Sequence, residues 1–291
     1  MAKQIKHQQF QCIYQNWVGQ QRLDLDELVQ TLTHYPTDHD YLQLITKKMV
    51  THFENYNTTR AQVAKHDAPS FLAPSWGSTF ENMFLWIGGC RPALMIRLVY
   101  TLCGSQLNSH LDEFLEGVHH GNLGDISSLQ LKRIDELHAK TVKDEDKLSS
   151  RVATLQEEIA DDPLVLLANG CRGVRESSEG GVVDKAMDMH GLHLYNVLME
   201  ADKLRMSTLK GMLDILTPFQ AVEFLVAAKK LHLSLHDWST RRDSKWGLLN
   251  YLGVIIRHPP VTHRRQHHHY GSREESCCCF FLCVHLAATV F

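Results

Sequence analysis

The sequence predicts an all-α fold, an antiparallel multi-helix bundle with one long central helix. Apolar residues recur at helical spacing along most of the chain, and the strict alternation typical of a half-buried strand is absent. Stop and cap signals at Pro36, Asp162-Pro163 and Thr217-Pro218 separate the periodic segments. With 291 residues, the chain is long enough for one large or two modest domains with a well-developed core.

Two long helices are expected near the N-terminus, over residues 8–34 and 39–66. Phe10, Ile13 and Trp17 begin the apolar stripe of the first helix, and the second carries a stripe of the same kind. Both stripes should face a common core.

A tight helix–helix corner is expected within Ala73–Pro92, which reads APSWGSTFENMFLWIGGCRP. Ser78 or Thr79 is in position to cap a helix over Phe80–Ile87, and the Gly-Gly pair that follows should end it. The aromatic residues of this helix, Trp86 among them, form a broad apolar face. We therefore expect the corner to lie inside the core.

Two further helices are expected over Ala93–Cys103 and Leu107–Val118, before the loop HHGNLGD. The longest periodic segment follows, a helix that Ser127 or Ser128 can cap and that runs to about Ala160.

Nine positions of this long helix, from Leu131 to Ile159, follow the 3,4 spacing of a coiled-coil seam. Polar His138, Thr141 and Glu145 interrupt the seam, which favours a long core helix over a dimeric coiled coil. The coiled coil remains the alternative interpretation.

The C-terminal part begins with a polar loop that contains GCRGVRESSEGG, followed by helices over residues 183–216 and from Thr217-Pro218 to about Arg241. The composition changes abruptly near Trp246. We therefore expect one helical domain over residues 8–243 and an atypical His/Cys-rich tail over residues 244–291, either disordered or an artefact of the gene model. A short membrane anchor and a metal site are the alternatives for the tail.

The composition argues against several classes of function. A net charge of −3 and a pI near 6.7 argue against a general polyanion binder. The N-terminus has no apolar stretch typical of a signal peptide, so the thiols are expected to be reduced. Cys12, Cys90, Cys103 and Cys171 are spaced singly and are expected to be small buried apolar residues.

Two histidine pairs are the candidate ligand sites. His232 and His236 lie four residues apart, so they share one helix face and could bind a zinc ion or offer one axial ligand to a haem. His190 and His193 form a similar pair, and for both pairs the alternative is simple packing. The phosphate-binding GxGxxG and GxxxxGK[ST] motifs and the GxSxG elbow are missing, so no enzymatic activity is expected.

Six blocks, in order along residues 8–243, give the chain a resemblance to the plant Delay-of-Germination family. The same domain is similar to the C-terminal part of TGA-type bZIP transcription factors. The blocks are YQNW (Tyr14–Trp17), APSWGSTFENMFLWIGGCRP (Ala73–Pro92), RLVYTLCGSQ (Arg97–Gln106), LQEEIAD (Leu155–Asp161), EADKLRMSTL (Glu200–Leu209) and KKLHLSLHDWSTRRD (Lys229–Asp243).

The resemblance implies a non-enzymatic regulator of seed dormancy and germination in abscisic-acid signalling. Such proteins act in the nucleus and cytoplasm by binding type 2C protein phosphatases, and they bind haem through histidines that match His232 and His236. If haem binds, only one of these two can be the main ligand, because both project from one side of one helix; His190 or His193 could supply a sixth ligand.

The alternative function is transcriptional regulation through TGA-type bZIP partners. A bZIP protein reads DNA with a basic helix held by a zipper, and neither precedes Gln11 in this sequence. Direct DNA contact and membrane binding are therefore not expected, whereas a homodimer is kept as an alternative to a monomer.

Overall fold

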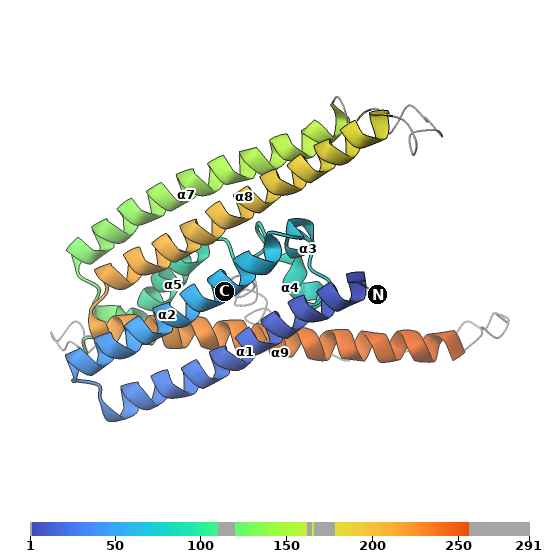
Figure 1. The fold of residues 1–291 in the computed structure, drawn as a ribbon. Helices are drawn as coiled ribbons and strands as arrows, with labels where there is room; N and C mark the ends of the chain where they lie inside the picture. Colours follow the sequence, from blue (N-terminus) through green and yellow to red (C-terminus); the bar gives the residue numbers. More distant parts are fainter. Residues whose placement is uncertain (1, 110–119, 162–164, 166–177, 256–291) are drawn as a thin grey trace, which may run out of the picture.

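The computed structural model of the protein describes residues 2–109, 120–161, 165 and 178–255 (Figure 1). In these ranges every regular element is a helix, apart from an isolated bridge between Trp86 and Gly89. The all-α fold class is therefore confirmed. No helix in the described ranges combines the length and the apolar character that crossing a membrane requires.

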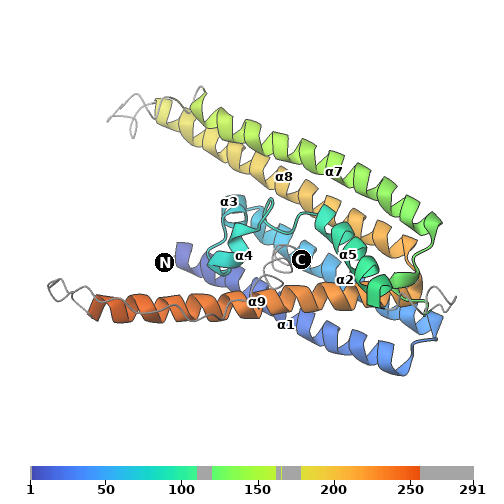
Figure 2. The ribbon, with the colours of Figure 1, turned by 180° about the vertical axis from the view of Figure 1, so that it is seen from behind.

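Three long helices form one side of the molecule: α1 (Ala2–His34), α2 (His39–Ala64) and α9 (Pro218–Ile255). They lie side by side in both views, and α1 runs opposite to α2 and to α9 (Figures 1 and 2). The Asp38 side chain caps α2 by accepting a hydrogen bond from the backbone N–H of Tyr41 at 3.0 Å. Buried Trp17 stacks on Tyr56 with ring centroids 4.4 Å apart, which joins α1 to α2 in the core.

The other side is a hairpin of α7 (Ser128–Glu157) and α8 (Ser178–Ile215), which run in opposite directions (Figures 1 and 2). The 3₁₀ turn η2 (Glu158–Ala160) extends α7. Ser127 and Gln130 form a capping box at the start of α7, so the expected long helix from Ser127 to about Ala160 is confirmed. These views are compatible with the expected antiparallel bundle.

The seam of α7 faces α8 within the same chain. Leu148 and Leu155 pack with Val197 and Ala201 in one buried cluster. This arrangement fits the interpretation as a core helix.

Each polar residue of the seam has a partner. The fully buried Glu145 accepts hydrogen bonds from Arg91 Nε at 2.7 Å and from the backbone N–H of Ala93 at 2.6 Å. Thr141 Oγ1 lies 3.3 Å from Thr208 Oγ1, and the His138 ring is 6.0 Å from that of Tyr100. Glu145 therefore fixes the start of α5 (Ala93–Ser109) against α7.

The expected helix over Phe80–Ile87 is wrong in extent, because α4 comprises only Thr79–Met83. The backbone of Trp86 then exchanges two hydrogen bonds with Gly89, at 2.8 and 3.2 Å, and the chain reverses. Ile87 has a φ of 45° and Gly88 a φ of 69°, a region that glycine adopts without strain and a β-branched residue rarely adopts.

The expectation that this corner lies wholly inside the core is also wrong. None of the residues of α4 is buried, Met83 is 66% exposed, and Trp86 is only half-buried. The capping box that Ser78 forms with Glu81 confirms the expected start of the helix.

The short α3 (Ala68–Leu72), capped by the Asp67 side chain, was not expected. Its proline lies in the first turn, where a missing N–H costs no hydrogen bond. The 3₁₀ turn η1 (Leu123–Asp125) precedes α7.

Three expected boundaries differ from the structure. The expected break between the helices Ala93–Cys103 and Leu107–Val118 is wrong, because α5 is one continuous helix from Ala93 to Ser109. Residues 110–118 lie outside the described ranges. α8 begins at Ser178, within the expected polar loop. α9 continues past Arg241 to Ile255, and the rest of the tail, residues 256–291, lies outside the described ranges.

Candidate functional site

A cavity of about 120 Å³ lies where α1, α2, α8 and α9 meet the segment from α3 to the start of α5. Its walls bring together residues from four of the six blocks that carry the family resemblance, although the blocks are far apart in sequence. These wall residues include Tyr14 and Trp17; Trp76, Glu81, Gly88 and Cys90; Asp202, Arg205 and Met206; and His232.

His232 lines this cavity and is 6% exposed. Its Nδ1 is buried without a hydrogen-bond partner. Burial lowers the pKa of His232 to about 4, so the imidazole is neutral near pH 7.

His236 lies one turn further along α9 and has a different environment. Its Nδ1 is 2.8 Å from Oε1 of Glu81, and its side chain is 22% exposed. The two histidines of the predicted pair thus share a helix face, but only His232 lines the cavity.

Glu81 is the centre of a hydrogen-bond network that holds α4 in place. Its Oε1 also accepts a hydrogen bond from Tyr14 Oη at 2.7 Å, and its Oε2 accepts from the backbone N–H and Oγ of Ser78 at 3.0 and 2.6 Å. Burial raises the pKa of Glu81, but the hydrogen bonds from His236, Ser78 and Tyr14 outweigh it and bring the pKa to about 2. The carboxylate is therefore ionised and ties α4 to α1 and α9.

A second network joins α2, α8 and the turn after α4. Arg205 donates from Nε to the carbonyl oxygen of Cys90 at 2.7 Å and from Nη2 to that of Ile87 at 2.9 Å. It also donates from Nη1 to Asp202 Oδ1 at 2.6 Å, and Arg60 Nη1 lies 3.4 Å from the same oxygen. Arg205 thereby fixes the strained turn around Ile87.

This second network is incompletely paired. Nε and Nη2 of Arg60 and Oδ2 of Asp202 are buried without a hydrogen-bond partner. Buried polar groups are rarely left in this state, and an ordered water commonly supplies the missing hydrogen bonds.

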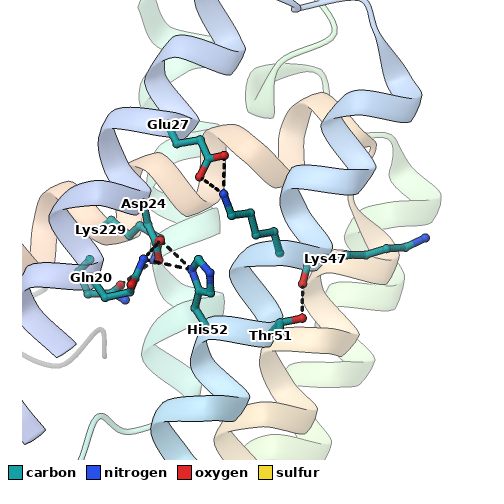
Figure 3. Close-up of polar contacts among 9 residues, drawn as sticks. Gln20, Asp24, Glu27, Lys47, Thr51, His52 and Lys229 are labelled. Atoms are coloured by element: carbon teal, nitrogen blue, oxygen red, sulfur yellow. Dashed lines mark hydrogen bonds and ion pairs between the residues drawn. The ribbon is translucent and has the colours of Figure 1, made fainter. Parts of the chain in front are cut away.

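A third network, centred on Lys229, is shown in Figure 3. Lys229 Nζ donates to Gln21 Oε1 at 2.7 Å and to Asp24 Oδ2 at 2.9 Å, and His52 Nδ1 lies 2.8 Å from Asp24 Oδ1. The ammonium also lies 4.8 Å from the ring centroid of Phe53. Burial lowers the pKa of Lys229 to about 8, and the neighbouring Asp24 limits this decrease.

Sequence reasoning missed the buried Arg60, Asp202, Arg205 and Lys229. Long charged residues are usually exposed, and a single sequence gives no signal that these four face the interior. The only indication in the sequence is that Asp202, Arg205 and Lys229 lie within the blocks that carry the family resemblance.

The described residues do not fit a haem at His232. The cavity of about 120 Å³ is smaller than the roughly 300–1,000 Å³ typical of sites for drug-sized ligands, and a porphyrin is at least of that class. Nδ1 of His236 already contacts Glu81. In the described part of the chain, no group of three or more His, Cys, Asp or Glu side chains is arranged to hold a metal ion.

The second histidine pair lies on α8, in the hairpin. His190 Nδ1 is 4.0 Å from Glu158 Oε2, and His193 is exposed. Neither is among the residues that line the cavity, so the structure does not bring this pair to His232.

The predicted burial of the scattered cysteines is confirmed only for Cys90. Cys103 is intermediate in exposure, and the expectation for Cys12 is wrong, because it is exposed. Cys171 lies outside the described residues.

Comparison with known proteins identifies relatives along most of the chain. The family model described as "DOG1: Seed dormancy control" matches residues 24–101. Protein DOG1-like 3 of Arabidopsis thaliana is 36% identical over 250 residues, which cover 83% of this chain and 87% of that protein.

More distant matches reach two other kinds of plant protein. Transcription factor TGA2.1 of Oryza sativa is 28% identical over 80% of this chain and 61% of its own length. Protein RESPONSE TO ABA AND SALT 1 of Arabidopsis thaliana is 24% identical over 83% of this chain and all of its own length. The 36% identity to DOG1-like 3 across most of both chains shows that this protein belongs to the Delay-of-Germination (DOG1-like) family.

Proposed function

We propose that this protein is a non-enzymatic regulator of seed dormancy and germination in abscisic-acid signalling, and that it acts by binding type 2C protein phosphatases. The observation that carries the proposal is the match to DOG1-like 3 over 83% of the chain. The match to a protein named for its response to abscisic acid supports the signalling context.

The cavity region supports a binding role over a catalytic one. Glu81 and Arg205 use their hydrogen bonds to fix α4 and the turn after it. α4 itself carries Met83 at the surface, where an apolar side chain can contact a partner.

Binding can be tested with the full-length chain and a panel of purified plant type 2C phosphatases. We expect at least one phosphatase to co-purify with the chain and to lose activity when the chain is titrated in. Met83→Asp should weaken this binding, whereas Leu44→Asp on α2 is the matched control, because the two side chains are 66% and 60% exposed. A chain that leaves every phosphatase unbound and fully active would contradict the proposal.

A second candidate function is transcriptional regulation through TGA-type bZIP factors. It is favoured by the TGA2.1 match, which covers 80% of this chain but 61% of that factor, so the likeness spans one portion of a longer protein. Retention of a TGA factor on the immobilised chain, with no phosphatase retained, would select this alternative. Light scattering of the same sample distinguishes a monomer from a homodimer.

The proposed role requires the protein in the nucleus and cytoplasm. A fluorescent fusion expressed in seed tissue should therefore show signal in both compartments. Haem binding also stays a prediction of the family resemblance.

A further inference from the structure

We propose that the cavity between α1, α2, α8 and α9 is a binding site for a small aromatic monocarboxylate, whose carboxylate binds Arg60. Neither the phosphatase proposal nor the TGA alternative requires this site. Three properties of the cavity support it: its size, its aromatic wall and its buried charge.

The size of the cavity limits the ligand to about one ring. An apolar cavity of about 150 Å³ holds a benzene molecule in another protein, and this cavity measures about 120 Å³. This cavity is therefore slightly smaller than one that holds benzene, so a single ring with its acid group fits only if side chains of the wall move outward, whereas a drug-sized molecule is too large.

One wall of the cavity is a cluster of aromatic side chains. Phe10 contacts Phe71 edge to face, with ring centroids 4.8 Å apart, and Trp76 lies 5.2 and 5.4 Å from these two rings. All three residues line the cavity. Such a wall favours a ligand with an aromatic ring, because offset and edge-to-face ring contacts contribute binding energy beyond the burial of apolar area.

The charge next to Arg60 favours an anion. Arg60, Asp202 and Arg205 are 4%, 6% and 8% exposed, so two guanidinium groups share one buried carboxylate. A buried charge without its own counter-charge is costly. Glu81, the fourth charged residue of the wall, brings the formal charge of the whole lining to zero, but both of its oxygens already have partners in Tyr14, Ser78 and His236.

The free donors have the geometry that a carboxylate requires. Nε and Nη2 lie on one edge of the Arg60 guanidinium, and both lack a partner. This edge can donate two parallel hydrogen bonds to the two oxygens of one carboxylate. Nδ1 of His232 offers one more hydrogen bond to the ligand from a neutral ring.

The test uses benzoate as the probe and benzamide as its neutral counterpart of the same shape. Isothermal titration of the full chain should show one saturable benzoate site, with benzamide binding at least about tenfold more weakly. Benzoate should also raise the melting temperature in a concentration-dependent way.

Arg60→Met removes the proposed anchor and leaves Asp202 paired with Arg205, so the variant is expected to fold. It should bind benzoate at least about tenfold more weakly than the wild type. Arg22→Met is the matched control, because Arg22 pairs with Asp237 outside the cavity and its loss should leave benzoate affinity unchanged.

Three results would overturn the proposal. The first is the absence of saturable benzoate binding, which means that the cavity holds water only. The second is equal affinity for benzoate and benzamide. The third is unchanged benzoate affinity in Arg60→Met. If circular dichroism shows that Arg60→Met is unfolded, Leu85→Phe serves instead, since it fills the cavity from its wall without changing the charge. Full benzoate binding by folded Leu85→Phe would equally refute the site.

Discussion

Nδ1 of His236 lies 2.8 Å from Oε1 of Glu81, so the last long helix holds the carboxylate of the short helix α4. Two further contacts join the same elements: Asp243 accepts a hydrogen bond from the backbone N–H of Thr79 at 2.7 Å, and the rings of Phe80 and Trp238 lie 4.7 Å apart. α4 has no buried residue of its own, so these contacts with α9, together with the hydrogen bond from Tyr14 on α1, determine its position. The histidine pair is thus divided between two roles, since His236 positions α4 while His232 lines the cavity.

Glu81 should make the stability of the protein depend on pH in the acid range. Its pKa is about 2 in the folded protein against an ordinary value of 4.5, so the folded state binds fewer protons than the unfolded state between these values. The contribution is therefore complete above pH 4.5 and is lost as the pH falls toward 2. Glu81→Gln should remove on the order of 2 kcal/mol of stability at pH 7 and flatten the profile in this window.

Urea unfolding at several pH values measures both effects. Glu54→Gln is the control, because Glu54 forms an exposed ion pair with Lys210 and should change stability by less than about 1 kcal/mol. An unaltered pH profile in Glu81→Gln would show that the network around Glu81 does not stabilise the fold.

Lys229→Met should destabilise the protein by about 3–5 kcal/mol, because it leaves the charge of Asp24 buried without its main partner. The double variant Asp24→Leu/Lys229→Met should recover much of this loss, since an apolar pair can replace a buried ion pair. Lys48→Met, which breaks the exposed pair with Glu27, is the control and should cost less than about 1 kcal/mol. Chemical denaturation of the four proteins would contradict the prediction if the double variant were less stable than Lys229→Met.

The long helices could be predicted from the sequence because the capping and apolar patterns that define them are local. Ser127 with Gln130 and Ser78 with Glu81 are capping pairs that both fold as such. The end of α4 was mispredicted because the turn at Ile87 is held by Arg205, a residue more than a hundred positions away. The cavity was not predictable for the same reason, since the pairing of Arg60 with Asp202 depends on how α2 meets α8. The histidine pair was found from its spacing, but spacing could not show that its members have different environments.

Trp86→Ala should cost about 2 kcal/mol, less than the roughly 3–5 kcal/mol typical of a fully buried tryptophan, because Trp86 is only half-buried. Its Nε1 donates to Ser149 Oγ at 3.0 Å, and its ring lies 5.5 Å from the Arg205 guanidinium carbon. Trp86→Phe keeps one aromatic ring but loses the hydrogen bond and the second ring of the indole, so it should cost less, about 1 kcal/mol. Equal losses in the two variants, measured by urea unfolding, would show that the remaining phenyl ring does not stabilise the protein.

Haem titration should distinguish the two histidines of α9. His232 has no room for a macrocycle beside it, whereas the His236 side chain is partly exposed. If the family property holds for this chain, His236→Ala should weaken the Soret response and His232→Ala should leave it nearly unchanged. A response lost only in His232→Ala would mean that the helices around the cavity separate when haem binds.

Deleting residues 247–291 should leave the melting temperature of the protein within about 2 °C of the full chain, which is no more than the shift of about 2–4 °C that a loss of 1 kcal/mol produces in a domain of this size. The contacts that fix the C-terminal part of α9 come from Trp238, Arg242 and Asp243, all of which the shorter chain retains. A shorter deletion, of residues 256–291, keeps the whole of α9 and separates the effect of the helix end from that of the remaining tail. A melting temperature that falls only in the longer deletion would show that residues 247–255 stabilise the domain, and a fall in both would show that the tail packs against it.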